Sequence, residues 1–277
     1  RNKKMKTVYK ILFAAVLLGT VSCKEEFLQT EPTELISANQ IAEASALNPG
    51  LQSANVAGIY ATMYGAGTGG TSGHDDFGHK SYDMYGDMLS GDMALTSVIY
   101  GWFRTITEFQ TTVDYTQQDN YQVWRFYYRL IFAANTVIDG LGGSDAIPAT
   151  AAGRWYMGQA KAMRAFSYFY LAQYFQNEYN PSEKILPLYK NTVDPNLPKS
   201  TAADVYALMV KDLTDAQTLL ADFNRANKSE VNAAVAKGML AYVHGAMGNN
   251  AAMKTVTADV ISTGGFKIMT AAEVTGG

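Results

Sequence analysis

Cys23 is the only cysteine in the 277 residues, and its surroundings predict a covalent modification of its thiol. The apolar run from Ile11 to Val21 precedes it, and four lysines lie before that run. A basic start followed by about 7–15 apolar residues is typical of a secretory signal, too short to remain as a membrane span. Residues 20–23, Thr-Val-Ser-Cys, have the form of a bacterial lipobox, although threonine replaces the usual leucine. We therefore expect a signal peptide over residues 1–22 and a lipid on Cys23; the alternatives are an ordinary signal peptide and a retained anchor helix.

A second group of residues with ligand-binding chemistry is His74, Asp75, Asp76 and His79. Two histidines with adjacent carboxylates can ligate Zn²⁺ or another divalent ion. Histidines five positions apart do not share a helix face, and the glycines around them indicate a loop. We therefore expect Asp75 or Asp76 to be a turn or cap residue, and we expect neither a metal site nor a cofactor.

Motifs of catalysis are missing from the sequence. No nucleophile elbow, Walker loop, Gly-x-Gly-x-x-Gly or His-Glu-x-x-His pattern occurs. Five aspartates between residues 75 and 92 could supply the carboxylate pair of a glycosidase, but so many acids single out no pair. We therefore expect a protein that is not an enzyme.

The charge balance argues against nucleic acid as a partner. Without the five basic residues of segment 1–22, 17 Lys and Arg remain against 25 Asp and Glu, a formal charge of −8. Such an acidic surplus repels a phosphate backbone. Attachment to a membrane would have to come from acyl chains on Cys23, and stable attachment needs more than one chain.

Helical periodicity dominates the second half of the chain. Apolar residues at spacings of three and four, from Trp124 to Ile138, predict a helix that ends at Gly140. A helix over 152–177 is so rich in aromatic residues that we expect it to be buried, and Arg164 within it needs an acidic or carbonyl partner. Further helices are predicted from Thr201, over 230–247 and over 250–263.

The other segments are predicted to be connections. Residues 66–80 and 86–117 have no sustained period, and four prolines in 180–199 indicate an extended loop. A helical pattern near 39–64 follows a polar tether over 23–38. Paired helices with Ala-x₃-Phe spacings predict an all-α, tetratricopeptide-like (TPR-like) helical solenoid with long loop insertions, over residues 39–277.

Three blocks of residues resemble the SusD/RagB family of outer-membrane nutrient-binding lipoproteins. Behind the lipobox, residues 23–32 are similar to its Cys-x-x-x-Phe-Leu-x-x-x-Pro start. The helix from Trp124 to Ile138 resembles its W…Y…I…N…I pattern, and residues 158–169 resemble its GEA-x-x-x-RA-x-x-YF signature, with Gln159 replacing the usual glutamate. The resemblance covers nearly all of residues 23–270. Because members normally continue for a long C-terminal part, the chain resembles an N-terminal portion.

The resemblance implies a lipid-anchored, non-enzymatic protein outside the outer membrane that binds oligosaccharides. It also implies a partner, a SusC-like TonB-dependent outer-membrane transporter, which the protein would cover as a lid and supply with ligand for import. The run Lys24-Glu25-Glu26 agrees, because such a run after the lipid cysteine resembles the surface-export signal of these lipoproteins.

The implied oligosaccharide needs flat aromatic faces against its C–H groups and amide or carboxylate oxygens for its hydroxyls. Residues 82–121 have this composition, and connections on a rigid scaffold commonly carry binding sites. We expect Asp92, Tyr100 and Trp102 to contact the ligand. For Tyr82 and Tyr85 the sequence favours packing against the helical body, and for Trp102 it leaves both roles open.

Two rival functions remain from the sequence. A TPR-type scaffold lipoprotein would bind only protein partners and would have no affinity for glycans. A secreted glycoside hydrolase would release reducing sugar from its substrate. The identity of the glycan is not encoded in any motif that we recognise.

Overall fold

The computed structural model describes residues 40, 44–45 and 48–276. The predicted signal peptide, Cys23 and the predicted tether lie outside these residues. The described residues from 44 to 276 belong to one compact unit. None of the described helices combines the length and the apolar composition that a membrane span requires.

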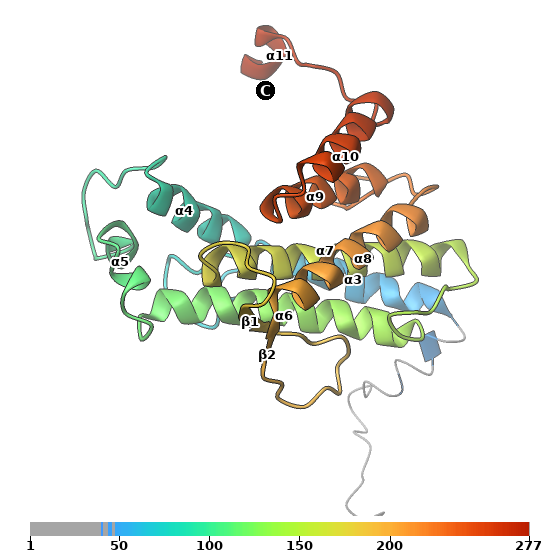
Figure 1. The fold of residues 1–277 in the computed structure, drawn as a ribbon, viewed down its shortest axis with the longest axis horizontal. Helices are drawn as coiled ribbons and strands as arrows, with labels where there is room; N and C mark the ends of the chain where they lie inside the picture. The colour runs from blue at the N-terminus through green and yellow to red at the C-terminus, as the bar shows by residue number, and fades with distance from the viewer. Residues whose placement is uncertain (1–39, 41–43, 46–47, 277) are drawn as a thin grey trace, which may run out of the picture. The chain divides into compact units, whose positions relative to one another are not determined.

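The described residues are mostly helical, which confirms the all-α prediction (Figure 1). In chain order the elements are η2 (Pro49–Leu51), α3 (Gln52–Thr62), α4 (His79–Ser90), α5 (Arg104–Thr107), η3 (Gln110–Thr112), α6 (Gln118–Gly140), α7 (Ala151–Phe175), β1 (Lys184–Pro187), β2 (Lys199–Thr201), α8 (Ala202–Leu219), α9 (Ala233–Ala246), α10 (Asn250–Thr263) and α11 (Ala271–Thr275). The two strands pair antiparallel, with an irregular register between Lys184 and Leu186.

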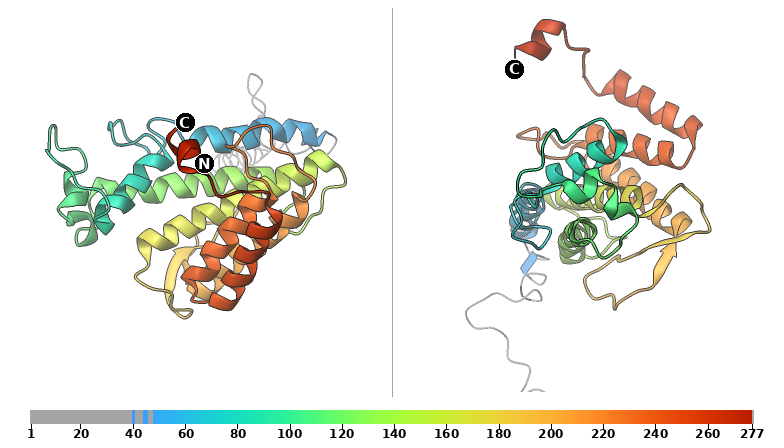
Figure 2. Two further views of the ribbon diagram at one scale, coloured as in Figure 1. Left: turned by 90° about the horizontal axis from the view of Figure 1, so that it is seen from above. Right: turned by 90° about the vertical axis from the view of Figure 1, so that its left-hand side faces the viewer.

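Consecutive long helices pack against one another from α6 to α10, in the manner of a helical solenoid (Figure 2). The close contact between α7 and the end of α8 depends on Gly158. A Cβ atom at Gly158 would lie 2.7 Å from Leu220 Cγ, so a larger residue would push the two segments apart. As predicted, Thr201 caps α8: its hydroxyl accepts a hydrogen bond from the Asp204 backbone N–H at 3.2 Å.

The structure corrects three expectations about connections. Helix α4 occupies residues expected to lie in loops. Its Tyr82 and Tyr85 are buried in the core, which confirms the favoured prediction that they pack against the helical body. The expected helical pattern near 39–64 is interrupted: residues 40, 44 and 45 are helical, and α3 begins at Gln52 after η2, because the residue before Pro49 disfavours helical backbone. The expected extended loop at 180–199 contains β1, which pairs with β2 at the loop's end.

The aromatic residues of α7 from Phe166 to Phe175 are less buried than their number in this helix predicts. Tyr168 is fully buried, whereas Phe166, Phe169 and Tyr170 are only half-buried. Phe169 faces a hollow between α7, α9 and α10 that is also lined by small residues of α9. The prediction that this run is core is therefore confirmed in part: Tyr168 is buried, and the other rings pack against the core with part of their surface exposed. At Phe169 the exposure arises because α9 presents glycine and alanine there.

Candidate functional site

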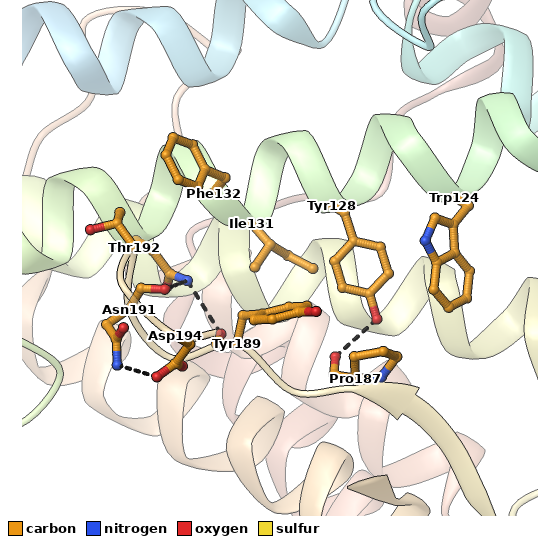
Figure 3. Close-up of a pocket in the computed structure, with 10 residues that line it drawn as sticks. Trp124, Tyr128, Ile131, Phe132, Pro187, Tyr189, Asn191, Thr192 and Asp194 are labelled. Carbon is orange, nitrogen blue, oxygen red and sulfur yellow. Dashed lines mark hydrogen bonds between the residues drawn. The ribbon is translucent and has the colours of Figure 1, made fainter. Parts of the chain in front are cut away.

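A groove of about 390 Å³ lies between α6 and the segment that follows β1 (Figure 3). Ten residues line it: Trp124, Tyr128, Ile131, Phe132, Asn135, Pro187, Tyr189, Asn191, Thr192 and Asp194. Figure 3 shows the rings of Trp124 and Tyr128 toward one end and amide, hydroxyl and carboxylate groups toward the other, where the Phe132 ring also lies. The groove is therefore amphipathic along its length.

The α6 wall follows from the spacing of its residues. Trp124, Tyr128, Ile131 and Asn135 recur every three or four positions, so they share one helix face. The rings of Trp124 and Tyr128 are tilted by 45° with centroids 4.8 Å apart, and both are half-buried. Each aromatic side chain thus keeps part of its surface open to the groove.

The opposite wall is an extended segment held by hydrogen bonds to two helices. The Tyr128 hydroxyl donates to the Pro187 carbonyl at 2.9 Å. The Asn135 amide donates to the carbonyls of Tyr189 and Asn191, each at 3.3 Å. The Tyr189 N–H donates to the hydroxyl of Tyr168 on α7 at 2.7 Å. These bonds fix the Tyr189 backbone, and the Tyr189 ring meets that of Tyr128 edge-on at 5.8 Å.

The polar end of the groove is a turn stabilised from within. Asp194 accepts hydrogen bonds from the Lys190 N–H at 3.0 Å and from the Asn191 side-chain amide at 2.8 Å. The Thr192 N–H and hydroxyl both donate to Asp139 on α6, at 2.7 and 2.8 Å. Because the turn is held at both ends, its polar side chains are arranged before any ligand arrives.

Arg164 lies behind the groove and connects its two walls. Its guanidinium pairs with both oxygens of Asp212 on α8, each at 2.8 Å, which confirms the predicted need for an acidic or carbonyl partner. Its third nitrogen donates to the Asn135 side chain at 2.8 Å and to the Lys190 carbonyl at 3.0 Å. Gln159, in the position of the family's glutamate, instead accepts a hydrogen bond from Tyr60 at 2.8 Å.

The groove is equipped to bind a polyhydroxylated ligand. Within the described residues, neither the Trp124 indole N–H nor the Tyr189 hydroxyl proton has a protein acceptor, although the Tyr189 oxygen accepts from the Leu197 N–H at 3.4 Å. These donors and the Asp194 carboxylate lie beside aromatic faces, the combination that saccharide C–H and hydroxyl groups require.

The residues that the sequence singled out as ligand contacts lie elsewhere. Asp92 and Tyr100 are exposed, and Tyr100 has left-handed backbone with φ of 63°. Trp102 is half-buried and stacks on His74, with ring centroids 5.2 Å apart. None of the three lines the groove. Their contact with a ligand stays a prediction.

The sequence reasoning missed the groove for an identifiable reason. The spacing of Trp124 and Tyr128 is that of a helix-packing face, and the prolines around the segment after Pro187 indicate only a connection. A tyrosine, an amide and a carboxylate within six residues, at Tyr189, Asn191 and Asp194, were the available signal. That composition is the same one that drew attention to residues 82–121.

The histidine–aspartate cluster is dispersed by the fold. Both oxygens of Asp76 accept backbone hydrogen bonds, from Gly69 at 2.8 Å and Thr71 at 2.9 Å, which confirms its expected role in a turn. His79 instead lies 2.9 Å from the Tyr127 hydroxyl, and burial lowers its pKa. Among the described residues, no three His, Cys, Asp or Glu side chains are placed to hold a metal ion.

Asp75 has the more unusual environment of the two acids. One of its carboxylate oxygens is buried without a partner among the described residues, and the other lies 3.4 Å from the Tyr85 hydroxyl. Burial raises the pKa of the Asp75 carboxyl, and the nearby Asp119 carboxylate raises it further. The folded protein therefore holds this proton more tightly than the unfolded chain does.

We expect Asp75→Asn to stabilise the protein increasingly, relative to the wild type, as pH rises. The raised pKa means that the wild-type site is most stable below the unfolded pKa and loses stability as pH rises through the folded pKa; asparagine does not ionise. Urea unfolding at about pH 4, 5.5 and 7 measures the difference. Asp145→Asn, at a side chain that is 90% exposed, is the control. If the difference in unfolding free energy between Asp75→Asn and the wild type shrank toward neutral pH, the raised pKa of Asp75 would be contradicted.

The comparison with protein families decides to which family the chain belongs. Residues 71–243, more than half of the chain, match the SusD-like family model described as starch-binding and associating with the outer membrane. The chain belongs to this SusD-like family. The match includes α6, α7 and the whole groove, so the SusD/RagB resemblance seen in the sequence is confirmed.

Solved structures with SusD-like folds agree with this assignment. A SusD-like carbohydrate-binding protein from Bacteroides vulgatus superposes with a TM-score of 0.71 at 23% identity, over 81% of this chain and 46% of that one. A laminarin-binding SusD-like protein gives a TM-score of 0.59 at 21% identity, over 78% and 45%. A structure solved with a xylogluco-oligosaccharide gives 0.57 at 20% identity, over 78% and 41%.

These likenesses establish the fold. The SusD-like chain spans less than half the length of the three solved structures. A comparison with curated proteins found no match.

Proposed function

We propose that this SusD-like protein binds oligosaccharides in the groove between α6 and the segment after β1. The observation that carries the proposal is the match to a family described as starch-binding. The groove supports it, because its open aromatic faces and its unpartnered donors suit a sugar ring. Two proteins of similar fold, one laminarin-binding and one solved with a xylogluco-oligosaccharide, also support oligosaccharide binding.

The size of the groove suits a short stretch of a longer oligosaccharide. Sites for small ligands commonly enclose about 300–1,000 Å³, and this groove, at about 390 Å³, lies near the lower limit. A glycan chain bound there would extend beyond both ends of the groove. Contact of such a chain with Asp92, Tyr100 and Trp102 stays the prediction that the sequence makes.

Substitution of Tyr189 tests the groove directly. We expect Tyr189→Ala to weaken binding of laminari- or xylogluco-oligosaccharides at least tenfold, because one of the aromatic faces and a hydroxyl donor are lost. Isothermal titration calorimetry measures the affinity, with thermal unfolding as a check that the variant is folded.

Two further variants make this test decisive. Tyr64→Ala removes a tyrosine that is 76% exposed and outside the groove, and it should leave the affinity unchanged. Trp102→Ala reports separately on the ligand contact that the sequence predicts for Trp102. If Tyr189→Ala kept the wild-type affinity for the oligosaccharides and Trp102→Ala lost it, the binding site would lie in the loops, and the groove proposal would be overturned.

Location and partner complete the proposal. The family description associates its members with the outer membrane. We propose that acyl chains on Cys23 anchor the protein there, exposed at the cell surface, and that it delivers its ligand to a SusC-like TonB-dependent transporter without chemical change. Mass spectrometry of the mature N-terminus tests the anchor, co-purification with a barrel protein tests the partner, and a reducing-sugar assay tests the absence of hydrolysis.

A further inference from the structure

The polar end of the groove carries negative charge. The Asp194 carboxylate lines the groove directly. Asp139, a second carboxylate, lies immediately behind the turn, where it accepts two hydrogen bonds from Thr192. A ligand that reaches this end therefore meets carboxylate oxygens.

Positive charge near the groove is directed elsewhere. None of the ten lining residues is a lysine or arginine. The Lys190 residue lines a different cavity, together with Lys211 and Asp204. Arg164 is fully buried, and its charge is paired with both oxygens of Asp212. No cation among the described lining residues is available to neutralise an anionic ligand.

The hydrogen bonds of Asp194 leave it able to accept more. Each of its oxygens accepts one protein hydrogen bond, from the Lys190 N–H or from the Asn191 amide. A carboxylate oxygen has two acceptor positions, so each can also accept from a ligand hydroxyl. A neutral sugar offers such hydroxyls, whereas a uronate or sulfate group offers only further negative acceptors.

We infer that the groove selects neutral oligosaccharides and that Asp194 is the residue that rejects anionic ones. This inference rests on the proposed function, since it specifies the class of saccharide for the same groove. A like charge held within a few ångströms at a partly hydrated surface is expected to weaken binding about five- to tenfold at low salt. The effect should decline as salt screens the two charges.

The experiment compares oligosaccharides that differ at C6, where a neutral hydroxymethyl group is replaced by a carboxylate. The probes are laminari- and xylogluco-oligosaccharides and the same compounds oxidised at C6 to uronic acids, titrated calorimetrically at low and high salt. The wild type is expected to bind the neutral member of each pair about five- to tenfold more tightly at low salt. In Asp194→Asn, the affinities for the neutral and the oxidised oligosaccharide should lie within about twofold of each other.

Two matched variants separate selectivity from structure. Asp194→Glu keeps the charge and should keep the preference. Asp222→Asn makes the same change of net charge at a side chain that is 60% exposed and outside the groove, and it should leave the preference intact. Thermal unfolding checks that Asp194→Asn is folded; asparagine can still accept from the Lys190 N–H.

The outcomes distinguish the inference from the function beneath it. Equal binding of neutral and oxidised oligosaccharides by the wild type, or an unchanged preference in Asp194→Asn, would overturn the selectivity and leave saccharide binding in place. If the wild type binds no member of the panel, the proposed function fails and the inference fails with it.

Discussion

Asp212→Ala is expected to destabilise the protein by about 3–5 kcal/mol, the cost of removing one partner of a buried ion pair. The Arg164 guanidinium is fully buried, and Asp212 is only 1% exposed. Without the carboxylate, a positive charge would remain in the interior with two of its nitrogens unpaired. Urea unfolding monitored by circular dichroism measures the loss.

A double replacement provides the control. Arg164→Met combined with Asp212→Leu removes both charges, so it should recover part of the lost stability, because no uncompensated charge remains. Full recovery is not expected, since the Lys190 carbonyl and the Asn135 side chain also lose their donor. If Asp212→Ala lowered the unfolding free energy by less than about 1 kcal/mol, the ion pair would not have its assigned role.

Gly78→Ala is expected to have an effect of similar size, about 3–5 kcal/mol, for a reason of backbone geometry. Gly78 precedes α4 with φ of 88° and ψ of −162°, a conformation essentially restricted to glycine. A Cβ there would clash with the carbonyl oxygen of Met63 and would lie 2.8 Å from the Met63 carbonyl carbon. The same oxygen accepts the 2.8 Å hydrogen bond from the His79 N–H that begins α4.

Gly91 offers a matched comparison at the other end of α4. It also has positive φ, 86°, but a Cβ there would meet no atom within 4 Å. Gly91→Ala should therefore cost only the strain of left-handed backbone, about 1–2 kcal/mol. Equal losses of unfolding free energy in the two variants would show that the contact with Met63 has no part in the effect.

Much of the fold was accessible from local sequence patterns. The helices α6 to α10 were predicted because hydrophobic periodicity and cap residues act within one turn of the chain. The need of Arg164 for an acidic or carbonyl partner follows from its position in an apolar helix, although the acid, Asp212, lies 48 positions away. Expectations failed where tertiary contacts set the outcome, as for α4 and for the half-buried Phe169.

The candidate site was much less accessible. The face of α6 that carries Trp124 and Tyr128 looks, from its spacing, like any face that packs in a core. Whether such a face is covered depends on which segment lies against it, and the segment here, from Pro187 to Asp194, is joined to Tyr128 by a contact across 59 positions. No local pattern encodes that distance.

The sequence by itself determined the helical class, most helix boundaries and the SusD-like relationship, because these depend on short-range spacing and on motifs read in order. Tertiary structure alone decided that one face of α6 became an open groove with a carboxylate at its polar end. The physical reason is that burial and charge environment belong to pairs of distant segments, so they exist only once the chain has folded.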